Sequence, residues 1–191
     1  MLVQAQYRFT AAEYYRLAET GVLKPGKQVE LMVGRIVDMS PIGPMHGGSV
    51  KRLIRLFSGL SAGRWLVSAQ DPVHLDEYSE PQPDLMLLKP AEDDYTSRHP
   101  RPEDVYLLIE VADASLEFDR EEKLPVYGRA GIAEVWILNL VARTLEVYRE
   151  PHFSGYAAHK TFRRGEAAFP LAFPDTAVHV SEILGGAGLE A

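Results

Sequence analysis

The feature that most constrains this chain is an almost continuous apolar run, Val105 to Val111, which contains one carboxylate, Glu110. A run of this kind is typical of a central strand that is covered on both faces of its sheet. A carboxylate inside such a strand is costly unless it is neutralised, paired or bound to a metal ion. The sequence therefore predicts a layered fold with a buried sheet, in which Glu110 is neutralised, paired or bound to a metal ion.

A second acidic residue, Asp84, opens another apolar strand, which we predict over residues 84–89. If the two carboxylates meet without a cation, they repel, and one of them stays protonated. A hard divalent cation such as Mg²⁺ would relieve this repulsion, because it prefers carboxylate, carbonyl and water ligands. The alternative, for either residue, is a carboxylate at a strand end that faces solvent or a nearby arginine.

A lysine on the next predicted helix, residues 119–130, could complete this site. Asp119, Lys123 and Tyr127 are spaced at i, i+4 and i+8, so they share one helix face. A lysine beside a bound metal can orient or help deprotonate an attacking water and stabilise developing negative charge. The alternative is an exposed lysine that pairs with Asp119. Pro125 lies inside the span, so we expect that the helix either begins later or bends there.

The rest of the chain alternates strands and helices, as in a mixed α/β (α+β) fold. Thr10 and Glu13 form a capping box that opens an N-terminal helix, which stops at Gly21. Two apolar runs around Gly34 predict a β-hairpin over residues 28–39, and helical spacing begins at Ser49. Further strands are predicted over residues 65–69, 73–75, 134–140 and 144–149. We expect one domain over residues 1–191, with a core at about 28–150.

Several of these segments together resemble a known family. They are Pro83-Asp84, then Leu-Leu-Ile-Glu110-Val-Ala, and a block from Asp119 to Trp136 that contains Glu-Lys123-Leu-Pro-Val-Tyr127-Gly-Arg-Ala-Gly131. An upstream segment, Glu30-Leu-Met-Val-Gly34 through Ser40-Pro41 followed by His46, belongs to the same pattern. The set is similar to the restriction endonuclease family often called Uma-two, of the PD-(D/E)XK nuclease-like superfamily, over residues of about 10 to 150.

The resemblance implies a restriction-endonuclease-like core, in which helices flank a mixed central sheet and to which the N-terminal helix and hairpin are added. It implies that Asp84 and Glu110 match the two acidic motif positions. The superfamily lysine normally stands two residues after the second acid, where this chain has Ala112. The resemblance implies that Lys123 takes this part from the following helix.

Five residues are possible supporting members of the site: Glu30, His46, Gln82, Asp119 and Tyr127. Glu30 and His46 could approach the metal from the hairpin and the first core helix, or they could be a surface residue and a helix-capping loop residue. Gln82 could bind a phosphate or lie exposed. Asp119 could tune Lys123 or cap its helix with Glu122 as partner. Tyr127 is more typical of a core than of a catalytic group.

The composition of the chain restricts the kinds of partner that it can bind. The formal net charge of −7 argues against nucleic-acid binding over the whole surface, although a local basic groove is compatible with it. A symmetric homo-oligomer could build such a groove, for example from the basic residues of the predicted helix at Lys51, Arg52 and Arg55. The chain has no cysteine, no run long enough for a membrane span and no signal-peptide pattern, so we expect a cytoplasmic protein.

Two functions fit these residues. The first is a nuclease that hydrolyses phosphodiester bonds in DNA, or less plausibly RNA, with Mg²⁺ or Mn²⁺ held by Asp84, Glu110 and the backbone carbonyl of Val111, and with Lys123 as the catalytic lysine. The second is a non-catalytic nucleic-acid-binding or assembly module that keeps the same fold. A basic rim around Asp84 would favour a phosphate substrate, and an acidic rim would not.

Overall fold

The computed structural model describes residues 6–24 and 26–185. A six-stranded sheet forms its centre, in the order β3-β4-β5-β6-β7-β8. Only the β5–β6 pair is parallel within this sheet, and its other pairs are antiparallel, which confirms the mixed central sheet. The strands are β3 (Leu66–Ser68), β4 (Leu85–Leu88), β5 (Val105–Ala112), β6 (Glu134–Asn139), β7 (Thr144–His152) and β8 (Gly155–Arg163).

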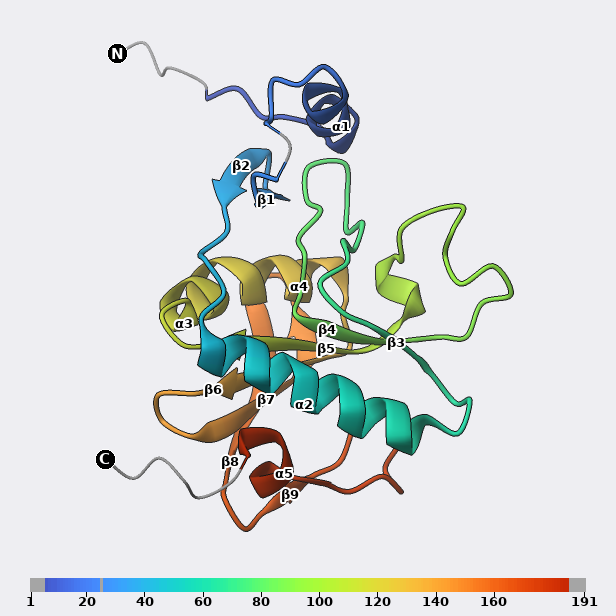
Figure 1. Cartoon of the computed structure of the whole chain (residues 1–191), viewed down its shortest axis with the longest axis vertical. Helices are drawn as coiled ribbons and strands as arrows, with labels where there is room; N and C mark the ends of the chain where they lie inside the picture. The colour runs from blue at the N-terminus through green and yellow to red at the C-terminus, as the bar shows by residue number, and fades with distance from the viewer. Residues whose placement is uncertain (1–5, 25, 186–191) are drawn as a thin grey trace.

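Helices cover both faces of this sheet, as Figure 1 shows. The long helix α2 (Pro44–Ser61) packs through Leu53 and Phe57 onto one face, together with the short C-terminal helix α5 (Val180–Leu184). The helix α4 (Leu124–Ala130) covers the other face, where Leu124 and Tyr127 pack against Leu108 of β5. The strand β5 is therefore buried on both faces, as its apolar run predicts.

The connection from β5 to β6 is one helical path in three parts. It begins with α3 (Leu116–Phe118), continues through a π-helical turn (Asp119–Lys123) and ends with α4. The predicted helix therefore begins earlier than expected, at Leu116. Pro125 has no N–H to donate, and it lies in the first turn of α4, directly after the π turn, where the missing donor costs least.

The N-terminal additions are confirmed. The helix α1 (Ala11–Glu19) begins at the predicted Thr10–Glu13 capping box, and Gly21 follows it. The hairpin consists of β1 (Val29–Met32) and β2 (Arg35–Asp38), and its turn contains Gly34 at positive φ. Both lie at one end of the sheet, near the top of Figure 1.

Two expectations about local structure were wrong. The first core helix begins at Pro44, not at Ser49, because Pro44 sits in its first turn, where the ring's fixed φ favours a helix start despite two glycines that follow. Residues 73–75 form no strand, because Val73 and His74 give their amide protons to the loop carbonyls of Pro81 and Pro100.

The C-terminal part adds structure that the sequence patterns did not indicate. The strand β8 pairs with β7 along the edge of the sheet, and a small sheet of β9 (Ala167–Ala168) and β10 (Val178–His179) leads into α5. A short 3₁₀ turn (Pro102–Asp104) directly precedes β5. In the described ranges no helix is both long and apolar enough to cross a bilayer.

Candidate active site

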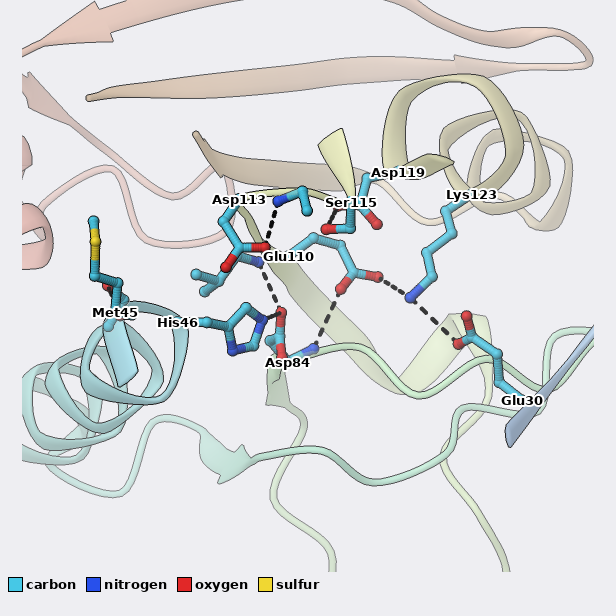
Figure 2. A network of polar contacts seen from close by, with 12 residues as sticks. Glu30, Met45, His46, Asp84, Glu110, Asp113, Ser115, Asp119 and Lys123 are labelled. Atoms are coloured by element: carbon cyan, nitrogen blue, oxygen red, sulfur yellow. Dashed lines mark hydrogen bonds and ion pairs between the residues drawn. The ribbon is translucent and has the colours of Figure 1, made fainter. Parts of the chain in front are cut away.

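Asp84 and Glu110 lie side by side on the same face of the sheet. The antiparallel register pairs Leu85 with Ile109, so Asp84, one residue before, stands opposite Glu110, one residue after. Alternation along both strands then turns the two carboxylates to the face that α4 covers. The Asp84 amide donates to Oε2 of Glu110 across 3.4 Å. The two acids that the sequence singled out are therefore neighbours, as Figure 2 shows.

Lys123 reaches this pair from the π-helical turn. Its Nζ lies 3.1 Å from Oε1 of Glu110 and 3.3 Å from Oε2 of Glu30, which stands on β1. All three residues are at most 5% exposed. Burial favours the neutral amine, but the carboxylates of Glu110 and Glu30 outweigh burial and raise the pKa of Lys123. The lysine therefore points inward and stays an ammonium.

Tyr127 stands one turn further along the same helix face, and its hydroxyl donates to Oε1 of Glu110 across 2.6 Å. The residue is fully buried, so it is both a core residue and a direct partner of the acid. Burial, opposed by the Lys123 ammonium, raises the pKa of Glu110 to about 8. The nearby charges of Asp119 and Asp84 raise this pKa further.

His46 approaches from the first turn of α2. Its Nε2 hydrogen-bonds to Oδ2 of Asp84 across 3.0 Å, and the same oxygen accepts the amide proton of Val111 across 2.8 Å. The Asp84 hydrogen bond, opposed by burial, raises the pKa of His46. Its Nδ1 is buried and has no hydrogen-bond partner among the described residues. The backbone of Val111 lies against Asp84, which keeps its carbonyl a candidate ligand.

Asp119 does not cap its helix, but its charge helps to raise the pKa of Lys123, as one of the two expectations had it. Since the helical path begins at Leu116, Asp119 lies inside it and cannot cap it; its carboxylate accepts the Ser115 hydroxyl across 2.8 Å. Glu122, the expected capping partner, instead pairs with Arg35. No direct ion pair joins Asp119 and Lys123 within the described part of the chain. Burial raises the pKa of Asp119 to about 6, although the Lys123 ammonium opposes this.

One cavity of about 300 Å³ is lined by Glu30, His46, Asp84, Glu110, Asp119 and Lys123, whereas Tyr127 lies behind this lining. Gln82 also borders it, and its backbone amide donates to Oε2 of Glu30 across 3.1 Å. Sequence reasoning missed other lining residues, namely Gln28, Asp38, Gln70, Asp113 and Ser115. Of these, Asp113 carried a usable signal, because it follows the strand of Glu110 directly. The glutamines and Ser115 carried none, because they come from separate loops.

The lining of this cavity is acidic. It contains six carboxylates, against one lysine and one histidine: Glu30, Asp38, Asp84, Glu110, Asp113 and Asp119, with Lys123 and His46. A basic rim is therefore absent from the described lining, and a phosphate would meet net negative charge there. Cations held by these carboxylates would neutralise the charge that a phosphate meets there.

The donor set fits a hard divalent cation. Oδ1 of Asp84 makes no hydrogen bond to a described residue, and Oε2 of Glu110 accepts only the long bond from the Asp84 amide. No group of three His, Cys, Asp or Glu side chains in the described ranges is arranged to hold a metal ion. An ion between Asp84 and Glu110 would thus need backbone, water or substrate oxygens as well, a set that Mg²⁺ commonly uses.

Comparisons with known proteins agree with this architecture. A family model described as "Putative restriction endonuclease" matches residues 11–181. The fold is similar to that of a solved structure, a putative nuclease belonging to DUF820 from Anabaena variabilis, with a TM-score of 0.71 and 13% sequence identity over 92% of this chain and 97% of that chain. No curated protein matches the chain.

Proposed function

The chain belongs to the Uma2 family of putative restriction endonucleases, and from that premise we propose that it is a nuclease that hydrolyses phosphodiester bonds in DNA with Mg²⁺ or Mn²⁺. The observation that carries this proposal is the convergence of Asp84, Glu110 and Lys123 from two strands and a helix onto one cavity. RNA is the second choice of substrate, because the family description names restriction enzymes.

Asp84 and Glu110 would hold the cation, together with the backbone carbonyl of Val111. A bound divalent cation supplies charge neutralisation and a more acidic water in such sites. His46 fixes the Asp84 carboxylate through one oxygen, which leaves the other free to bind. Tyr127 orients Glu110 in the same way from the opposite side.

Lys123 acts as a fixed positive charge in this account. Its carboxylate neighbours raise its pKa, so at neutral pH it holds its proton and does not take one from water. An ammonium at this position stabilises negative charge that develops on the phosphate oxygens. Glu30 holds the ammonium from the hairpin side, 3.3 Å away, and so acts as a positioning residue.

The test is cleavage of fluorescently labelled DNA with Mg²⁺, with Mn²⁺ and with EDTA. Asp84→Asn removes the charge of a proposed metal ligand at constant size. We expect its cleavage rate to fall by more than about 10–100-fold, which is the usual effect of mutating a residue that only hydrogen-bonds to a metal ligand. Asp94→Asn is the matched control, since Asp94 is exposed, lies outside the cavity and has a positive φ that asparagine tolerates. Equal cleavage by wild type and Asp84→Asn, with folding intact, would mean that a contaminant cuts.

The second function is a non-catalytic nucleic-acid-binding or assembly module, and one observation favours its assembly form. The acidic lining would repel a phosphate backbone if no cation were bound. A folded protein that neither cleaves nor binds DNA with Mg²⁺, with Mn²⁺ or with EDTA would support an assembly module and oppose the nuclease.

A homo-oligomer remains part of the proposal. Lys51 and Arg55 are exposed on α2 but do not line the cavity, and Arg52 is engaged by Ser49 and by the Ile183 carbonyl. A second copy could bring such basic residues near the acidic cavity. Light-scattering mass in solution tests this, and a monomer would refute it.

A further inference from the structure

We propose that the cavity beside Asp84 and Glu110 holds one unstacked nucleotide, so that the substrate is a single strand or an unpaired strand end and not continuous duplex DNA. This inference rests on the proposed nuclease function and narrows its substrate class. The cavity measures about 300 Å³, at the lower end of the range for small-ligand pockets. A base can enter an enclosing pocket only when it has left its stack and its partner.

Part of the cavity lining is apolar, and we refer to this part as the apolar wall. Pro41 and Ile42, before α2, contribute to it, and Phe118 contributes from the end of α3. Pro41 and Ile42 are exposed, Ile42 by 44%, so they present apolar surface that no other part of the described chain covers. Stacking of one base on an aromatic side chain typically contributes roughly 5- to 150-fold in affinity. The wall suits a base, whereas a phosphate gains nothing there.

Three carboxamides border the same cavity: Gln28, Gln70 and Gln82. Within the described residues none of their side chains makes a hydrogen bond, so their donors and acceptors are available to a ligand. A carboxamide offers one acceptor and two donors, the groups that complement the edge of a base. Three free amides around an apolar wall are therefore a set of base-reading groups, which a general phosphate site would not need.

Gln70 adds an independent sign of a functional position. It follows β3 with a φ of 58°, in the left-handed region that residues other than glycine and asparagine seldom adopt. Strained conformations of this kind concentrate at binding and active sites. In this backbone conformation the exposed Gln70 lies on the cavity lining.

The charge of the lining argues against a duplex. A protein that follows a duplex neutralises several phosphates with lysine and arginine side chains. The cavity lining offers one such residue, Lys123, against six carboxylates. Affinity must then come from the base and from bound cations at one phosphate, and we expect a shallow salt dependence, with about one or two phosphates neutralised.

The experiment measures fluorescence anisotropy of a labelled 12-nucleotide DNA strand, alone and as a blunt duplex. Ca²⁺ replaces Mg²⁺, because it is a hard cation that also prefers oxygen ligands. Binding is then measured separately from the cleavage assay, which uses Mg²⁺ and Mn²⁺. We expect the single strand to bind at least about 10-fold more tightly than the duplex. We expect Gln70→Ala to weaken single-strand binding by about 5- to 10-fold, the usual effect of one hydrogen bond.

Gln6→Ala is the matched control, because Gln6 is exposed and borders a different cavity. Equal binding of strand and duplex, or equal affinities for Gln70→Ala and Gln6→Ala, would overturn the inference. Cleavage of DNA within a duplex as fast as within a single strand would overturn it too, while leaving the nuclease proposal intact. Tight, Gln70-dependent single-strand binding without cleavage in any metal would instead refute the nuclease and leave the pocket.

Discussion

Removal of the Lys123 ammonium should destabilise the fold strongly, because it leaves two buried carboxylates without a cation. Glu30 and Glu110 are each 3% exposed, and Lys123 Nζ lies within 3.3 Å of both. Removal of one partner of a buried ion pair costs about 3–5 kcal/mol. Glu110 can take up a proton near neutral pH, since its pKa of about 8 rises further without the lysine. We therefore expect Lys123→Met to lower the free energy of unfolding by about 3 kcal/mol, the lower end of this range.

Urea unfolding, followed by circular dichroism in EDTA at pH 8, measures this cost. At an m value of about 2 kcal/mol/M the midpoint should fall by about 1.5 M. Lys27→Met is the control, because the Lys27–Asp38 pair is 52% and 70% exposed and should contribute at most about 1 kcal/mol. The triple variant Glu30→Gln, Glu110→Gln, Lys123→Met should recover most of the loss. A cost for Lys123→Met no larger than that for Lys27→Met would refute the buried triad.

Two further predictions concern stability. Burial raises the pKa of Glu146, but hydrogen bonds led by that from Arg120 outweigh it and hold the pKa below the usual value of 4.5. The folded state then binds fewer protons, so this stabilisation is complete above about pH 4.5 and is lost as pH falls through the folded pKa; a thermal-unfolding profile of Glu146→Gln should fall less steeply in acid, and an unchanged profile would contradict the assignment. Gly128→Ala should destabilise by about 2–3 kcal/mol, because its Cβ would overlap the carbonyl of Gly155. Gly59→Ala, which meets nothing within 4 Å in α2, should instead stabilise by about 0.5–1 kcal/mol, and equal effects of the two substitutions would refute the close contact.

The sequence predicted the parts of the site that depend on regular periodicity. Their places in apolar strands singled out Asp84 and Glu110, and the i, i+4, i+8 spacing predicted one helix face for Lys123 and Tyr127, which both contact Glu110 in the structure. Both are local patterns, and Lys123 and Tyr127 share one face although a π turn interrupts the helix at Asp119–Lys123. The family resemblance is confirmed by the match to residues 11–181.

The parts that depend on long-range contacts could not be predicted. Glu30 becomes a partner of Lys123 only because the hairpin lies over the site, and no local pattern encodes that contact. The family pattern made His46 a candidate from the first core helix, but the helical spacing itself begins only at Ser49, because neighbouring glycines weaken it although Pro44 starts the helix. Gln28 and Gln70 come from separate loops, so only the folded chain shows them on one cavity.

The central claim is that Asp84 and Glu110 hold one divalent cation together. The most direct measurement is anomalous scattering from a crystal soaked in Mn²⁺, with a crystal of Asp84→Asn soaked alongside. We predict a peak between the two carboxylates in the wild type, with Lys123 still beside Glu110, and no peak in the variant. A wild-type site without anomalous density at saturating Mn²⁺ would contradict the claim.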